Sequence, residues 1–153
     1  NAFSFPDLLT EEPAKLRAAM AMRARAASRF FVDLDGQSYQ SEAAGSVPAI
    51  GGNDNTTQYA RRAGLSSTAT LAGPNISFTV RYPHPQGTGD QSEGWLDFVQ
   101  LNVRRALRMA GAQLAFRDQR TLAFPTAAFV LEGANSNIAV WDVTNPLQPA
   151  LVD

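Results

Sequence analysis

The chain has 153 residues, of which 44% are hydrophobic and 18% are charged, with a formal net charge of -1. Domains of roughly 100 to 150 residues are the commonest, so we expect one compact domain with a sizeable core. Charge this low and this dispersed excludes a polyanion-binding surface, and nucleic acid is not expected as a partner. No apolar run approaches the roughly 20 residues of a membrane helix, so membrane insertion is not expected either.

Residues 1–14 combine two Pro with an acidic cluster and no sustained period, and they are interpreted as an N-terminal linker. The domain itself is predicted over residues 15–145. Residues 15–27 are rich in Ala, Met and Arg, which favour a helix by propensity. Their apolar side chains nevertheless fall at every second position, and this period predicts a strand.

Residues 28–42 repeat the alternation and contain Asp35-Gly36, a dipeptide typical of a tight hairpin turn. Gly, Pro, Asn and Asp in residues 43–56 predict a long loop. Short strands are expected in residues 57–64, 66–73 and 75–83. Residues 94–107 are apolar on both parities, with Trp95 and Phe98 on opposite ones, which predicts a central strand covered on both faces.

Three further strands are expected in residues 112–118, 127–133 and 136–143, because each run is bounded by Gly, Pro, Asn or Asp. Residues 146–153 contain two Pro and are interpreted as a linker leading out of the domain. About nine or ten short strands with little helix predict an all-β fold, an antiparallel β-sandwich of jelly-roll-like type.

No catalytic residue is predicted. The chain has no Cys and a single His, which excludes a Cys-His pair within it, and His84 lies in a Pro-His-Pro loop without a nucleophile elbow. Asp97 and Asp142 each lie beside a Trp in an apolar strand and could serve a hydrolase as paired carboxylates. The favoured interpretation is that they cap strand ends or pair with an Arg.

No cofactor is expected, although two oxygen-rich loops give a weak calcium hypothesis, since calcium prefers carboxylate and carbonyl ligands. The carboxylates concerned are Asp33, Asp35 and Asp54. Turn chemistry explains the same residues, and neither loop has the spacing of a recognised calcium site.

Two kinds of binding surface remain open. Aromatic rings could form a saccharide-stacking platform, although core packing is the commoner use of such residues. The candidates are Tyr59, Tyr82, Trp95 and Trp141. Arginine forks could clamp carboxylates of a neighbouring domain. The interface candidates are Arg104, Arg105, Arg108, Trp141 and Asp142.

Four short motifs are distinctive: Trp-Leu-Asp at 95–97, Asn-Val-Arg-Arg at 102–105, Gly-Ala-Gln-Leu at 111–114 and the Ile-Ala-Val-Trp-Asp-Val-Thr-Asn-Pro run at 138–146. Together they resemble the region that precedes the peptidase domain in gingipain-type cysteine peptidases of the type IX secretion system. Residues 24–38 also look like the family's strand and hairpin, so the likeness spans roughly residues 15–150. Phe98 stands where the family usually has Tyr, and Val103 where it usually has an aromatic residue.

The resemblance implies a non-catalytic β-sandwich module that positions or stabilises a following peptidase domain, which would hold the catalytic Cys and His beyond Asp153. It also implies an extracytoplasmic location, at the cell surface, associated with the outer membrane, or secreted. Because the chain begins without Met or an export leader, we expect an internal piece of a longer precursor. The alternative hypothesis is a carbohydrate-binding module of a secreted multidomain protein.

Overall fold

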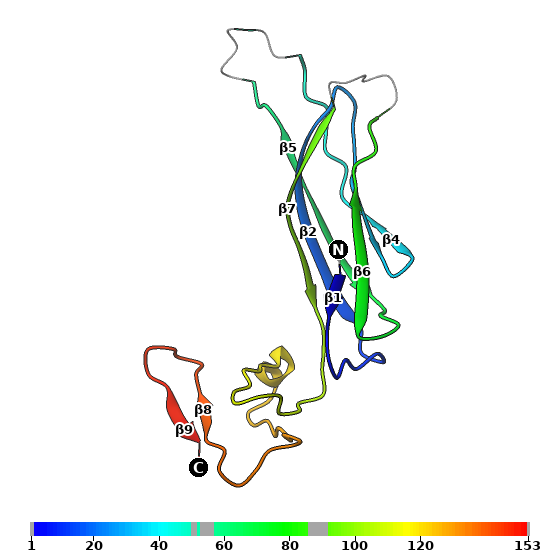
Figure 1. Cartoon of the computed structure of the whole chain (residues 1–153). Coiled ribbons are helices and arrows are strands. Elements are labelled where there is room, and N and C mark those ends of the chain that lie inside the picture. Colours follow the sequence, from blue (N-terminus) through cyan, green and yellow to red (C-terminus); the bar gives the residue numbers. More distant parts are fainter. Residues whose placement is uncertain (1, 50–51, 53–56, 86–91, 153) are drawn as a thin grey trace. The chain divides into compact units, whose positions relative to one another are not determined.

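The computed structural model describes residues 2–49, 52, 57–85 and 92–152. The chain divides into two compact units, residues 1–105 and residues 106–153 (Figure 1). The sequence pattern predicts one domain over residues 15–145. The described residues contain nine strands, all paired antiparallel, and one short 3-10 helix, so the all-β, sandwich-like prediction is confirmed.

The first sheet of residues 1–105 has the order β1-β6-β3-β4. Its strands are β1 (Ala2–Ser4), β6 (Asn75–Arg81), β3 (Phe31–Leu34) and β4 (Gln37–Gln40). The β3-β4 hairpin turns through Asp35 and Gly36, whose φ angles of 45° and 81° lie in the left-handed region that Asp tolerates and Gly favours. Residues 2–4, expected in a linker, instead form β1, and Phe3 stacks on Phe78 with ring centroids 4.7 Å apart.

The second sheet has the order β5-β2-β7. Its strands are β5 (Arg61–Ala69), β2 (Ala14–Arg23) and β7 (Glu93–Asn102), and β5 merges parts of two predicted strands. The strand prediction for β2 is confirmed, with alternate residues buried along its length. The prediction of a central β7 is wrong. β2 is central, because it pairs with both neighbours, and β7 lies at the edge.

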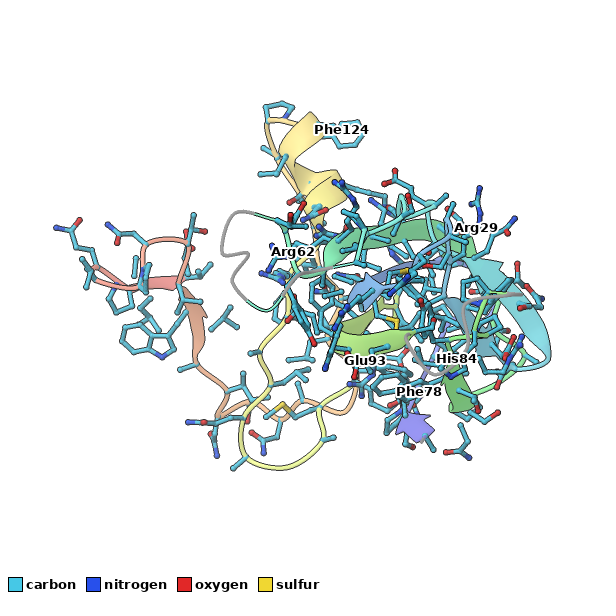
Figure 2. The ribbon with its side chains drawn as sticks, turned by 90° about the horizontal axis from the view of Figure 1, so that it is seen from above. Arg29, Arg62, Phe78, His84, Glu93 and Phe124 are labelled. Atoms are coloured by element: carbon cyan, nitrogen blue, oxygen red, sulfur yellow. The ribbon has the colours of Figure 1, made fainter. Side chains whose placement is uncertain are left out.

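The core of this unit lies between the two sheets. Val32 of β3 and the preceding Phe30 pack with Leu16 and Met20 of β2 in one buried cluster. Burying a side chain of this size contributes about 1.5 to 3 kcal/mol, so the cluster is the main source of stability. Figure 2 looks along the strands, with side chains filling the space among them.

A small polar network is sealed into the same unit. The Tyr82 hydroxyl donates to Ser28 Oγ at 3.1 Å and accepts from Ser92 Oγ at 3.1 Å. Ser28 and Ser92 are both buried. Because buried hydroxyls are costly unless hydrogen-bonded, this network fixes the Tyr82 ring in place.

Residues 106–153 are built differently. They contain η2 (Gln119–Ala123) and a hairpin of β8 (Val140–Asp142) with β9 (Ala150–Val152). The predicted strands at 112–118 and 127–133 are wrong, apart from an isolated bridge between Arg108 and Glu132. β9 lies in the predicted C-terminal linker. Nowhere in the described chain is a helix long and apolar enough to cross a membrane.

Candidate functional site

A β-bulge in β7 places two aromatic rings on one face of the second sheet. Ala19 of β2 pairs with Phe98, whereas the next residue, Met20, pairs with Leu96, so Asp97 is the extra residue. Beyond the bulge, Ala21 pairs with Trp95. Paired residues share a face, so Trp95 and Phe98 both stand on the outer face with Ala19 and Ala21. They remain 42% and 40% exposed.

The rest of this outer face combines small residues with charged ones. Gly64 of β5 pairs with Ala19, so the small residues Ala19, Ala21 and Gly64 form a floor beside the two rings. Arg62 pairs with Ala21 and borders this floor. Two open hollows, of about 550 Å³ and 290 Å³, meet at Ala19 and Phe98. We call this surface the outer groove. Its charged lining residues are Arg17, Glu42, Arg62 and Asp97.

Tyr59 stands at one end of the outer groove. Its ring centroid lies 6.1 Å from that of Trp95, with the two planes inclined at 48°. The Arg23 guanidinium covers the Tyr59 ring at 4.4 Å, and the Tyr59 hydroxyl lies 3.4 Å from Glu93 Oε2. Arg23 and Glu93 also approach each other at 4.0 Å. Two of the predicted saccharide-stacking residues, Tyr59 and Trp95, are therefore neighbours.

The other two predicted stacking residues lie elsewhere. Tyr82 packs against the core and is held by its buried hydroxyl network. Trp141 belongs to β8 of residues 106–153 and is 55% exposed.

Two of the three carboxylates proposed for calcium, Asp33 and Asp35, are engaged by protein groups. Arg81 of β6 makes a forked ion pair with Asp33, and Nη2 lies 3.0 Å from Oδ1. These hydrogen bonds hold the pKa of Asp33 at about 2, below its usual 3.8. Asp35 Oδ1 accepts from the Ser77 backbone N–H at 2.9 Å. Asp54 lies outside the described residues, within which no three His, Cys, Asp or Glu side chains group around a metal-sized site.

The predicted interface arginines also have partners within their own units. Arg104 lies 3.9 Å from Glu12, and the Arg105 guanidinium donates to the Pro6 carbonyl. Arg108 pairs with Glu132 at 2.9 Å. The contacts of Arg104 and Arg105 connect the residues after β7 to the N-terminal segment. The ion pair of Arg108 joins two segments of the C-terminal unit.

Within the described residues, the catalytic candidates His84, Asp97 and Asp142 lie in separate segments of the chain. His84 has its ring beside Tyr82, with centroids 5.8 Å apart. Asp97 lies in the β7 bulge, and Asp142 is in the other unit. The Thr144 backbone N–H donates to Asp142 Oδ1 at 2.8 Å, which lowers the pKa of Asp142. The 153 residues include no Cys and therefore no thiolate nucleophile.

Residues 106–152 expose most of their large apolar side chains, and we call this stretch the apolar segment. None of its residues is buried. Phe124 projects from the end of η2 (Figure 2) and is 68% exposed, and Leu147 is 89% exposed. Others with large exposed areas are Leu122, Val130, Trp141, Val143 and Leu151.

Searches against protein-family models, curated proteins and solved structures find no match. The candidate site is therefore argued from its geometry alone. Phe98 was not predicted as a partner of Trp95, because a strand without a bulge would place residues 95 and 98 on opposite faces. The only signal was a charged residue, Asp97, inside an apolar strand.

Proposed function

We propose that this chain is a non-catalytic β-sandwich module of a larger exported cysteine peptidase of gingipain type. In this proposal the sandwich of residues 1–105 is a stable scaffold, and the apolar segment packs against the neighbouring peptidase domain. The observation that supports it best is the complete lack of buried residues in that segment.

A segment of this size has little means of stabilising itself. Below about 70 to 80 residues a single hydrophobic core rarely supplies more than about 3 to 5 kcal/mol without metals, disulfides or a partner. An isolated two-stranded hairpin such as β8-β9 is marginal for the same reason. Each large apolar side chain that a neighbour covered would contribute about 1.5 to 3 kcal/mol.

The composition of the last residues suits a protein neighbour. Residues 136–152 contain one charged side chain, Asp142, among Trp141, Val143, Leu147 and Leu151. Centres of protein interfaces are depleted of charge and enriched in aromatic anchors. We therefore place the interface on these apolar residues rather than on Arg104, Arg105 and Arg108, whose side chains serve partners within the chain.

The catalytic part of the proposal comes from the sequence motifs. Without Cys and with one His, this chain cannot supply a Cys-His pair. The resemblance at residues 95–105, 111–114 and 138–146 assigns that pair to a following domain. Export to the cell surface or beyond is part of the same proposal.

The test is the intact mass and sequence of the native protein from its source cells. We expect a domain with catalytic Cys and His in the same chain. The backbone amides of residues 106–152 should then exchange hydrogen more slowly in the whole protein than in residues 1–153 alone. A mature chain that ends near Asp153, or equal exchange in both forms, would overturn the proposal.

A further inference from the structure

We infer that the outer groove is a binding site for a neutral saccharide chain, with Trp95 and Phe98 as its stacking wall. This site lies within residues 1–105 and is independent of the docking proposed for residues 106–152. Three features support this site: the placement of the rings, the small residues of the floor and the balance of charge.

The ring placement follows from the bulge at Asp97. Trp95 and Phe98 stand beside Ala21 and Ala19, which are two residues apart on β2. Such residues are separated by roughly 6 to 7 Å along a strand. Two half-exposed rings at this spacing can each lie under one of two successive sugar units, whose C–H faces pack on aromatic rings. Bulges commonly re-aim side chains in this way beside functional sites.

The floor leaves room for a chain-like ligand. Ala19, Ala21 and Gly64 carry little or no side chain, and a Cβ added at Gly64 would meet nothing within 4 Å. The hollows of about 550 Å³ and 290 Å³ open to solvent on either side of Phe98. Volumes of this order accommodate small-molecule ligands, and an open groove admits a chain that continues past it.

The charges favour a neutral ligand over the other classes. Arg17 and Arg62 balance Glu42 and Asp97 along the lining. A nucleic acid or another polyanion requires an excess of positive charge. A protein interface would have few charges at its centre, whereas four charged side chains line this groove. Sugar hydroxyls both donate and accept hydrogen bonds, so they match carboxylates and guanidinium groups together.

Tyr59 terminates the groove. Arg23 covers the Tyr59 ring at 4.4 Å, and the ring is inclined at 48° to Trp95, so it does not extend the same stacking plane. Its position beside Glu93 instead supplies a polar end to the aromatic wall.

The experiment begins with an array of neutral and acidic glycans, probed with the whole chain. Hexasaccharides of β-1,4-glucose, β-1,3-glucose and α-mannose are then titrated calorimetrically. We expect binding to at least one neutral glycan. Trp95→Ala and Phe98→Ala should each weaken it by about 3- to 10-fold, the loss expected for one stacking contact. The matched control Trp141→Ala should leave affinity unchanged.

A second variant separates binding from folding. A Cβ at Gly64 would meet nothing within 4 Å, so the Gly64→Leu side chain starts from an open position on the floor. Thermal stability should therefore hold while saccharide affinity falls at least 10-fold. The inference is overturned if no neutral glycan binds, if only acidic glycans bind, or if affinity survives Trp95→Ala and Gly64→Leu unchanged.

Discussion

The two units use similar side chains with opposite results. In residues 1–105, alternate apolar residues of β2 are buried, and strands of both sheets share one core. In residues 106–153, β8 and β9 contain Trp141 and Leu151 at comparable positions, yet every described residue of both strands is exposed. Apolar alternation stabilises a strand only where a second layer covers it, and the second unit contains no such layer.

The largest expected effect is the difference in stability between a variant in the core of residues 1–105 and a variant in the apolar segment. Phe30 is fully buried in the core cluster, so Phe30→Ala should lower the free energy of unfolding by about 3 to 5 kcal/mol. Leu122 is 87% exposed, so Leu122→Ala should change it by less than about 0.5 kcal/mol. Urea denaturation followed by circular dichroism measures both. A comparable loss for Leu122→Ala would mean that the apolar segment has a core of its own.

A smaller effect should come from the close packing of the first unit. A Cβ at Gly94 would lie 2.8 Å from Tyr82 Cδ1 and 2.9 Å from Met20 Cε. Hydrogen bonds to Ser28 and Ser92 restrict the movement of Tyr82. Gly94→Ala should therefore lower the free energy of unfolding by about 1 to 3 kcal/mol. Gly64→Ala in β5 is the control, since its site is open. Equal melting temperatures for the two variants would show that Tyr82 is free to move.

The smallest effect concerns the ion pair on the first sheet. The pKa of Asp33 is lowered to about 2, so its pairing with Arg81 stabilises the fold above pH 4 and is lost as the pH falls towards 2. Both side chains are partly exposed, so solvent screening keeps the contribution of the ion pair small. Asp33→Asn should destabilise the protein at pH 7 and match the parent near pH 2. Arg81→Gln should behave alike, and a difference that persisted at pH 2 would contradict this assignment.

The local pattern of the chain predicted part of this fold. The period of two in β2 outweighed the helix propensity of its Ala, Met and Arg residues, because alternate burial stabilises a strand more than propensity stabilises a helix. Asp35-Gly36 predicted the hairpin, since few other dipeptides accept two left-handed φ angles. Tyr59 and Trp95 were both candidates for saccharide stacking, although nothing in the sequence placed them side by side.

Other features depended on contacts between distant residues. Whether a strand is central or at an edge is decided by its neighbours, and β7 has an apolar pattern that suits either position. The strand predicted at 112–118 failed because it lacks a pairing partner among the described residues. The one predicted at 127–133 failed because its pairing is limited to the isolated bridge of Glu132 with Arg108. In the sequence, Asp33 and Asp35 resemble ion ligands. In the structure their oxygens accept hydrogen bonds from Arg81 and Ser77, which lie more than 40 residues away in sequence.

The sequence by itself determined that the protein is all-β, that β2 is a strand, and that a Cys-His centre is absent from these 153 residues. These properties depend on composition or on neighbours a few residues apart. Tertiary structure alone decided that Trp95 and Phe98 share a face, because one extra residue in β7 reverses the side-chain alternation. It also decided which apolar residues are buried, since burial requires a second layer that no single segment encodes.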